Sequence, residues 1–385
     1  MKNFTRAMVS ALVMVLILSF SMTGAAQAAS PARIAIVCSA AGQNDTGYNK
    51  SACDSVKQLS TDLGIEYKIV EPANGVAAAL ETLAEDGYNL IFNLEYDFDA
   101  LVKGVGGADA IAAQYPDTWF VVFNADPNRN EDGTAMHKNV ISVLFDVHEG
   151  SYLSGYAYVY MNENQKELFG DGYNMTAPDA ARAVGFVGGT NSDGILVFSY
   201  GFMQGMERAC TELDAKYDYY AKYDAGFGDP ALGATVAGTM FDNGANAVFA
   251  VAGVVGDGIA SKAREVGKLA IEVDGNLDAQ QPGHIITSVL KNTGTPVATI
   301  TKAYVDGSIG AMENLQSYNI ASGGTGITDM SEISKYVKNA DVFGEIKAKV
   351  AAVQDEIAAG TQKIVNRQIG EEFDPVTACP HLTIK

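Results

Sequence analysis

One local pattern occurs twice in this chain: a short apolar run leads through a loop of small and polar residues into a helical segment. The two copies begin at Arg33 and at Arg182, which are 149 positions apart, and the helical segment of the second copy runs from Ile195 to Leu213. A continuous apolar run is typical of a strand that is buried on both faces, as in parallel sheets covered by helices. The repetition therefore predicts two lobes of similar construction that face one ligand.

Further runs rich in Val, Ile and Phe alternate with helical segments along the rest of the sequence. We expect strands at 33–38, 66–70, 90–93, 119–123 and 140–145, and then at 183–187, 217–222, 247–251, 269–273 and 285–289. Asp229 before Pro230 is a helix-start signal, and Asp257 before Gly258 is another. The pattern predicts an α/β protein with two parallel sheets of about five strands each. In such sheets ligands bind outside the carboxyl ends of the strands.

The first 28 residues have the form of an export signal. Lys2 and Arg6 precede an apolar run from Ala7 to about Phe20, and Ala26-Gln27-Ala28 has the small-x-small form of a cleavage site. The apolar run of about 15 residues is shorter than the roughly 20 that a spanning helix needs. No cysteine lies at the cleavage point to accept a lipid. We therefore expect a mature protein that is exported, soluble and periplasmic, although a retained anchor is the alternative.

Charge and cysteine content narrow the class of protein. The formal net charge is −20, and loss of Lys2 and Arg6 with the signal changes it to −22, which disfavours nucleic acid as a partner. The mature chain, with 48% apolar residues, is long enough for two ordinary domains. The spacing of the four cysteines matches no metal motif, so we expect buried free thiols. If a disulfide forms, it should involve Cys379 in the polar C-terminal tail.

Motifs for catalysis, cofactors and metals do not stand out. Gly253, Gly256 and Gly258 lack the order of the dinucleotide fingerprint, and the sequence shows no P-loop and no nucleophile elbow. The four histidines are scattered without metal-ligand spacing: His137, His148, His284 and His381. We therefore expect neither a cofactor nor a metal, and no enzyme.

The loop from Gln43 to Asn49 has the composition of a recognition site. It holds a carboxylate at Asp45, amides at Asn44 and Asn49, and an aromatic ring at Tyr48. Such a set suits a flat heterocycle with polar edges. The alternative is a turn that caps the next helix, with Tyr48 packed on it. The residues alone favour neither interpretation.

A resemblance to a known family favours the first interpretation. Gln43-Asn44-Asp45 followed by Gly47-Tyr48-Asn49-Lys50-Ser51 resembles the Asn-Asp-x-Ser-Phe-Asn-Gln-Ser motif of the basic membrane protein family, the nucleoside-binding lipoproteins of ABC importers often called purine nucleoside receptors. Further matches follow in family order at 184–205, 252–258, 272–274 and 287–292, of which the Thr-Ser-x-x-Leu-Lys-Asn stretch is the most specific. Together the matches cover most of the chain from Arg33 to about Gly326.

The resemblance implies a type I periplasmic-binding-protein fold that closes by a hinge on a purine nucleoside. In such a protein Asp45 accepts hydrogen bonds from the base, Asn44 and Asn49 shape the loop, and Tyr48 stacks on the base. Asp274 and Lys291 hold ribose hydroxyls from the second lobe. Four further positions complete the implied site: Gly253 lets backbone approach the ligand, Phe198 is a second aromatic wall, and Asn124 and Asn276 stand where the family commonly has carboxylates.

Those two asparagines leave fewer acceptors than the family offers, so a different purine derivative or another small polar ligand is also compatible with the sequence. The implied N-terminal lobe comprises 29–146 plus about 292–318, the C-terminal lobe 147–291 plus about 319–360, and a polar surface tail 361–385. The expected partner is an ABC transporter permease. Two other functions stay open: a receptor for a sugar or signalling molecule that works with a sensor, and an exported nucleoside hydrolase.

Overall fold

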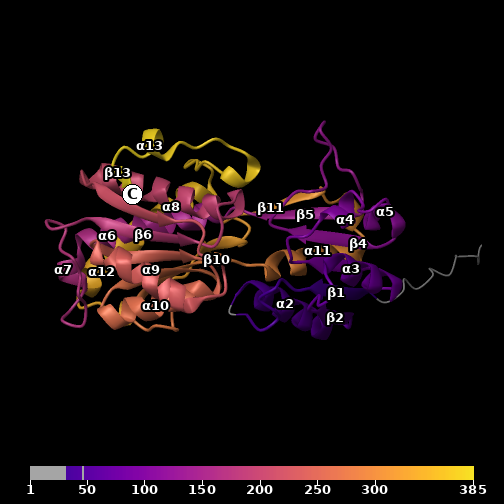
Figure 1. Ribbon diagram of the computed structural model, residues 1–385, viewed down its shortest axis with the longest axis horizontal. Coiled ribbons are helices and arrows are strands. Elements are labelled where there is room, and N and C mark those ends of the chain that lie inside the picture. Colours follow the sequence, from indigo (N-terminus) through magenta and orange to yellow (C-terminus); the bar gives the residue numbers. More distant parts are fainter. Residues whose placement is uncertain (1–31, 46) are drawn as a thin grey trace, which may run out of the picture.

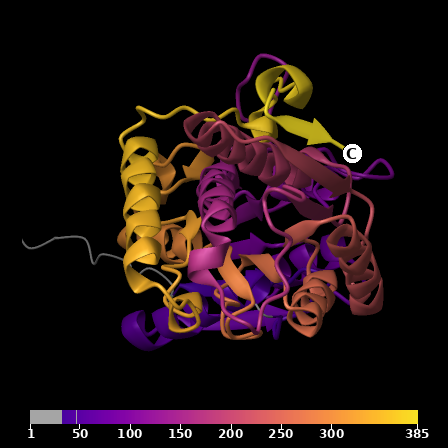
Figure 2. The ribbon, with the colours of Figure 1, turned by 90° about the vertical axis from the view of Figure 1, so that its left-hand side faces the viewer.

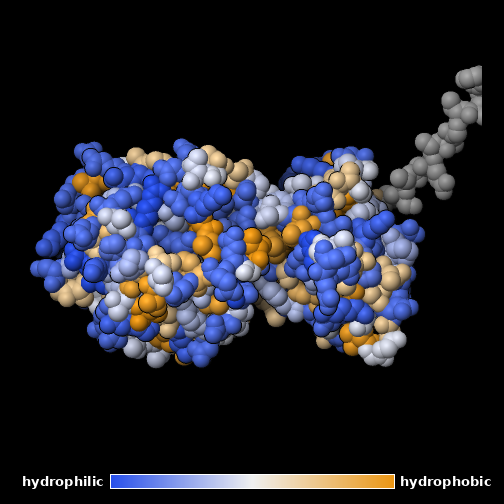
Figure 3. Space-filling model, turned by 90° about the horizontal axis from the view of Figure 1, so that it is seen from above, coloured by the Kyte–Doolittle hydropathy of each residue, from blue (hydrophilic) through white to orange (hydrophobic). Residues whose placement is uncertain are grey.

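The computed structural model describes residues 32–45 and 47–385, so the predicted signal segment lies outside the described residues. The protein is an α/β protein of two lobes, each with a parallel-dominated sheet between helices. The two lobes lie end to end along the long axis of the molecule (Figure 1). Figure 3 shows them as two masses joined by a narrower waist.

The first lobe contains a six-stranded sheet in the order β11-β5-β4-β3-β1-β2. Its strands are β1 (Arg33–Val37), β2 (Glu66–Val70), β3 (Leu90–Asn93), β4 (Trp119–Phe123), β5 (Val140–Phe145) and β11 (Leu315–Tyr318). One face is covered by α2 (Tyr48–Leu63) and α11 (Gly294–Asp306). The other face is covered by α3 (Val76–Glu85), α4 (Asp99–Val102) and α5 (Ile111–Gln114). Neighbouring strands run parallel, so their carboxyl ends share one edge.

The second lobe contains a seven-stranded sheet in the order β12-β10-β9-β8-β6-β7-β13. Its strands are β6 (Ala183–Gly188), β7 (Tyr217–Lys222), β8 (Ala245–Val251), β9 (Leu269–Asp274), β10 (Ile285–Lys291), β12 (Thr325–Ile327) and β13 (Leu382–Ile384). Figure 2 shows α12 (Ala340–Ala358) on one flank of this lobe, with α9 (Pro230–Asp242) and α10 (Val254–Val266) on the other. The remaining helical elements are α6 (Val147–Glu163), α7 (Gln165–Leu168), α8 (Asp193–Leu213), α13 (Pro375–Ala378), and the 3₁₀ turns η1 (Ile309–Ala311), η2 (Ile333–Lys335) and η3 (Arg367–Ile369).

Helices α6 and α8 pack at very short range because three glycines leave room for backbone. A Cβ at Gly155 would lie 2.2 Å from the carbonyl oxygen of Phe202, and one at Gly205 would lie 1.9 Å from that of Tyr152. A Cβ at Gly201 would come within 2.4 Å of the carbonyl oxygen of His148. Side chains at these three positions are therefore excluded by sterics, and the helix pair forms a rigid base for the second lobe.

The chain crosses between the lobes three times: from β5 to α6, from β10 to α11, and from β11 to β12. The first and third crossings are bonded to each other. Asp146 N–H donates to the carbonyl of Tyr318 at 3.0 Å, the Ser317 hydroxyl donates to Asp146 at 2.9 Å, and the N–H of Ile320 donates to Glu149 at 2.8 Å. Short paired crossings of this kind form a hinge between domains.

The ten predicted strands are all present, but the structure differs from the expectations at several points. The helix expected to open at Asp257 begins earlier, at Val254, with Gly253 as its N-cap. Three short strands, β11, β12 and β13, extend the sheets at their edges. The last of them belongs to the polar tail expected on the surface, and it pairs in parallel with β7 and leaves Cys379 fully buried. All four cysteines are buried and unbridged, as expected.

Candidate ligand-binding site

The loop after β1 is held in shape by the carboxylate of Asp45. One oxygen of Asp45 accepts from the N–H groups of Gly47 and Lys50 at 3.2 and 2.8 Å, and the other accepts from the N–H and side-chain amide of Asn49 at 2.8 and 3.0 Å. The carboxylate therefore satisfies N–H groups at the start of α2, where a negative charge is also favoured by the helix dipole. The four donors match its four acceptor sites, which is the capping arrangement that the sequence left open.

The ring of Tyr48 is fixed between two neighbouring strand ends. Its hydroxyl donates to the carbonyl of Leu94, just after β3, at 3.0 Å, and accepts from the side-chain amide of Asn124, just after β4, at 2.6 Å. Burial raises the pKa of Tyr48 well above its usual range, so the phenol stays neutral. The ring itself is only partly buried. A neutral aromatic face is therefore presented at the carboxyl edge of the first sheet.

Opposite this ring, the second lobe contributes a buried ammonium group. Lys291, the last residue of β10, has its Nζ 5.7 Å from the ring centroid of Tyr48 and 5.1 Å from that of Phe198 on α8. Burial lowers the pKa of Lys291, and the nearby carboxylate of Asp274 opposes this shift. Burial raises the pKa of Asp274, which Lys291 opposes in turn. Tyr48, Phe198, Lys291 and Asp274 therefore form one constellation built from both lobes.

Two of the predicted site residues have an uncommon backbone conformation. Asn124 has φ 65° and Asp274 has φ 70°, and they are two of only four non-glycine residues with positive φ in the described part of the chain. Asn124 directly follows β4 and Asp274 is the last residue of β9, and a left-handed residue at a strand end turns the chain sharply. Asn and Asp tolerate this region better than other side chains. Strained residues of this kind cluster at functional sites, which supports the placement of the site here.

The two lobes touch at the proposed site. A Cβ at Gly47 would lie 2.7 Å from the backbone nitrogen of Gly275, so the loop before α2 abuts the loop after β9. The Thr293 hydroxyl, in the second crossing, donates to the carbonyl of Tyr48 at 2.6 Å. The start of α2 is therefore bonded to the hinge, and a rotation of the lobes would move Tyr48 relative to Lys291.

The remaining predicted residues surround this constellation in different ways. Asn49 is buried and holds the loop through Ser39, accepting from its N–H and donating to its hydroxyl, each at 2.9 Å. Asn44 is exposed, and Asn276 is also exposed and accepts from the N–H of Asp278 at 3.3 Å. Gly253 has φ 55° and ψ −130°, a conformation that only glycine adopts readily. Of these four residues, Asn49 is the one whose side chain faces the interior of the loop.

Two exposed aromatic residues near the site were not predicted. Tyr96, after β3, is 57% exposed. Its hydroxyl approaches the other lobe and would lie 3.4 Å from a Cβ at Gly194, which is in the first turn of α8. Phe227, after β7, is 48% exposed, and its ring would lie 2.2 Å from a Cβ at Gly189. Both follow a strand in a loop at the carboxyl edge, so inspection of every such loop for aromatic residues would have found them.

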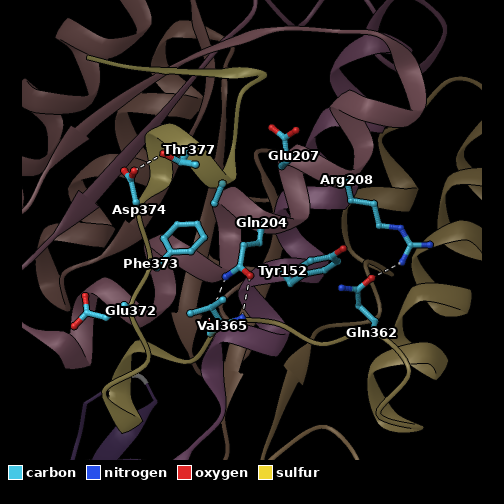
Figure 4. Close-up of a pocket in the computed structure, with 11 residues that line it drawn as sticks. Tyr152, Gln204, Glu207, Arg208, Gln362, Val365, Glu372, Phe373, Asp374 and Thr377 are labelled. Carbon is cyan, nitrogen blue, oxygen red and sulfur yellow. Dashed lines mark hydrogen bonds between the residues drawn. The ribbon is translucent and has the colours of Figure 1, made fainter.

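A groove of about 540 Å³ lies elsewhere, between α8 and the C-terminal segment. Figure 4 shows its lining residues, several of which are already bonded within the protein. Gln204 exchanges hydrogen bonds with the backbone of Val365, and Arg208 forms an ion pair with Glu356 at 2.6 Å. Because its polar groups are paired and it lies away from the strand ends, we place the ligand at the strand ends instead.

No group of three or more His, Cys, Asp or Glu side chains within 32–45 and 47–385 is arranged to hold a metal ion. Over the same ranges, none of the helices combines the length and the apolar character that crossing a bilayer requires.

Known proteins similar to this chain agree with the two-lobed architecture. The chain is 25% identical over 329 residues to basic membrane protein A of Borreliella afzelii, covering 85% of this chain and 87% of that protein. It is also 25% identical over 351 residues to the ABC transporter nucleoside-binding protein BmpA of Lactococcus lactis subsp. cremoris, with coverage of 85% and 87%. A solved ABC transporter solute-binding protein from Aeropyrum pernix K1 shares the fold, with a TM-score of 0.66, 22% identity, and coverage of 90% and 95%.

A family model gives the decisive match. The model for PnrA-like ABC transporter substrate-binding proteins matches residues 33–363. This range includes the first lobe, the second lobe except for β13 and the rest of the C-terminal segment, and every residue of the constellation around Tyr48 and Lys291. The chain therefore belongs to the family of PnrA-like ABC transporter substrate-binding proteins.

Proposed function

We propose that this protein is an exported receptor that captures a purine nucleoside between its two lobes and delivers it to an ABC importer. The observation that carries the proposal is the pairing of the fixed, partly buried ring of Tyr48 with the ammonium of Lys291 across the lobes. The nucleoside-binding name of the relative from Lactococcus lactis supports the same ligand class. Periplasmic location follows from the export signal that we expect at residues 1–28.

Each element of the constellation suits one part of a nucleoside. Tyr48 offers a face on which a base can stack. Phe198, which was predicted as a second aromatic wall, is only 1% exposed and belongs to the core of the second lobe, where its ring centroid lies 5.1 Å from Nζ of Lys291. Asp274 and Lys291 bear an acceptor and donors that suit ribose hydroxyls. We assign Asn49 and Asp45 to shaping the loop, because the carboxylate of Asp45 already accepts four N–H groups. Asn44 and Asn276 lie at the exposed rim, and Gly253 allows close approach of backbone.

Ligand binding would favour the closed arrangement of the lobes. A nucleoside that contacts Tyr48 from one lobe and Asp274 and Lys291 from the other gains its full set of contacts only when both lobes meet it. Such differential contacts shift the equilibrium toward closure. An importer permease that recognises the closed form would then accept loaded receptor in preference to empty receptor. No covalent step is required for this function.

The most direct test is mass spectrometry of the small molecules released when protein purified without added ligand is denatured. We expect an intact purine nucleoside in an amount comparable to that of the protein. Free purine base together with ribose would instead indicate the nucleoside hydrolase. A sugar or another signalling molecule in stoichiometric amount would indicate a receptor of the alternative class.

A further inference from the structure

The C-terminal segment 364–385 lies beyond the family match and is firmly attached to the second lobe. The side chain of Gln204 on α8 accepts a hydrogen bond from the N–H of Val365 at 2.9 Å, and the ring centroids of Phe373 and Tyr200 are 4.8 Å apart. Farther along, β13 pairs with β7 and Cys379 is fully buried. Figure 1 shows this yellow segment on the outside of the second lobe and then reaching toward the first.

From this anchorage, three consecutive residues contact the hinge and the site. Asn366 donates to the carboxylate of Asp146, in the first crossing, at 3.0 Å. Arg367 forms an ion pair with Asp193, in the first turn of α8, at 2.9 Å. Gln368 donates from its side-chain amide to the backbone carbonyl of Asn124 at 3.0 Å. The C-terminal segment therefore bridges the second lobe to the residue that fixes the ring of Tyr48.

Asn124 and Gln368, which are joined by this bond to the Asn124 backbone, each have a side-chain amide oxygen without a partner. The Oδ1 atom of Asn124 and the Oε1 atom of Gln368 are both buried and accept no hydrogen bond from the described residues. Asn124 as a whole is only 6% exposed. Leaving a buried acceptor unsatisfied destabilises the folded state. Native proteins rarely leave such groups unpaired, and exceptions often serve a function.

We infer that Gln368 is a specificity-determining residue, whose amide oxygen and that of Asn124 form a pair of acceptors for a hydrogen-bond donor of the ligand. The inference rests on the proposed function and deepens it. Both acceptors are neutral, and the amide nitrogen of each side chain is already used, for Tyr48 and for Asn124 itself. The pair therefore suits a neutral N–H or O–H group, which a purine base or its ribose provides, and disfavours an anionic group.

The test is a cycle that changes the protein and the ligand together. Calorimetry measures the affinity of the parent protein and of Gln368→Met for whichever of inosine, guanosine and adenosine the parent binds most tightly. The same titrations use analogues that lack hydrogen-bond donors: the 2′-, 3′- and 5′-deoxynucleosides each lack one ribose hydroxyl, and purine riboside lacks both the N1–H and the exocyclic amino group. Gln58→Met, at an exposed position on α2, is the matched control.

We expect the parent to bind one analogue about tenfold more weakly than the full nucleoside, as loss of one hydrogen bond predicts. Gln368→Met should bind the full nucleoside about tenfold more weakly than the parent does. It should bind that analogue as tightly as the parent binds it, and Gln58→Met should behave as the parent for every ligand. Equal weakening of all ligands, or no weakening, would overturn the role of Gln368 and leave the proposed function intact. Failure of the parent to bind any of the three nucleosides would instead contradict the proposed function.

Discussion

The side-chain amide of Asn124 donates a 2.6 Å hydrogen bond to the hydroxyl of Tyr48, and this bond joins the loop after β4 to the first turn of α2. The same hydroxyl donates to the carbonyl of Leu94 after β3. The orientation of the ring is therefore set by two strand ends rather than by its own loop. A ring held in this way is preorganised for stacking, which lowers the entropy that a ligand must lose on binding.

Replacement of Tyr48 separates the role of the ring from that of its hydroxyl. Tyr48→Ala should weaken binding of a purine nucleoside by one to two orders of magnitude, because stacking of a base on an aromatic ring contributes roughly 1 to 3 kcal/mol. Tyr48→Phe keeps the ring and should cost no more than about tenfold. Calorimetry of both variants measures this difference, and an unchanged affinity of Tyr48→Ala would remove the ring from the site.

Asp45 tests whether the loop carboxylate acts through structure. Asp45→Asn replaces one of two acceptor oxygens by an NH₂ group facing backbone donors, so the free energy of unfolding should fall by about 1 to 2 kcal/mol. Urea unfolding of the ligand-free protein measures the loss. Asp242→Asn removes the same charge at an exposed position on α9 and should leave stability unchanged. If Asp45→Asn were as stable as the parent but bound the nucleoside weakly, the carboxylate would instead contact the ligand directly.

The contact between α6 and α8 predicts a large effect of one methyl group. In Gly205→Ala the new Cβ would lie 1.9 Å from the carbonyl oxygen of Tyr152. The free energy of unfolding should therefore fall by about 3 kcal/mol, which is at the upper end of overpacking effects. Gly344→Ala is the control, because it lies in the interior of α12 with no atom within 4 Å of the added Cβ. That change should stabilise the protein by about 0.5 to 1 kcal/mol. Similar thermal midpoints for the two variants would contradict the close packing of α6 and α8.

The hinge should be sensitive to pH through Glu149. Burial raises the pKa of Glu149 from its ordinary value near 4.5 to about 7. Between pH 4.5 and 7 the folded state therefore holds a proton that the unfolded state releases, so the stabilising contribution of this carboxyl is fully present below pH 4.5 and is lost as the pH rises through 7. Glu149→Gln removes this loss and can still accept from the N–H of Ile320. Its unfolding temperature should exceed that of the parent at pH 8 and match it near pH 4.5.

The control for this prediction is Glu345→Gln, which neutralises an exposed carboxylate on α12. Its unfolding temperature should follow that of the parent over the same pH range. A difference between Glu149→Gln and the parent that stays constant from pH 4.5 to pH 8 would show that the carboxyl of Glu149 does not titrate with the hinge.

Most of the main strands could be predicted from the sequence because they are buried on both faces and are therefore continuous apolar runs, whereas β2 and β7 are partly exposed and carry polar residues. The segment β4, with the sequence WFVVF, is an example of a continuous apolar run. The edge strands β11, β12 and β13 could not, because they are three or four residues long and partly polar. Their pairing depends on neighbours that are distant in the sequence, such as β7 for β13.

The residues of the candidate site could be named from the sequence where they belong to recognisable motifs and not where they are brought together by long-range contacts. The motif around Tyr48 and the strand end at Lys291 indicated two facing parts of one site, and the structure brings them within 5.7 Å. The capping role of Asp45 was an open alternative, because the four N–H groups that donate to its carboxylate can be identified only in the structure. Gln368 carries no local signal, because its contact with Asn124 spans 244 positions.

The central claim is that a purine nucleoside binds between the lobes and leaves unchanged. Calorimetric titration of ligand-free protein with adenosine, guanosine and inosine, followed by chromatography of the recovered ligand, tests it most directly. We expect one site per chain for at least one of these nucleosides, with affinity in the micromolar range or tighter, and recovery of the intact nucleoside. Absence of binding by all three in a folded protein, or recovery of free base, would contradict it.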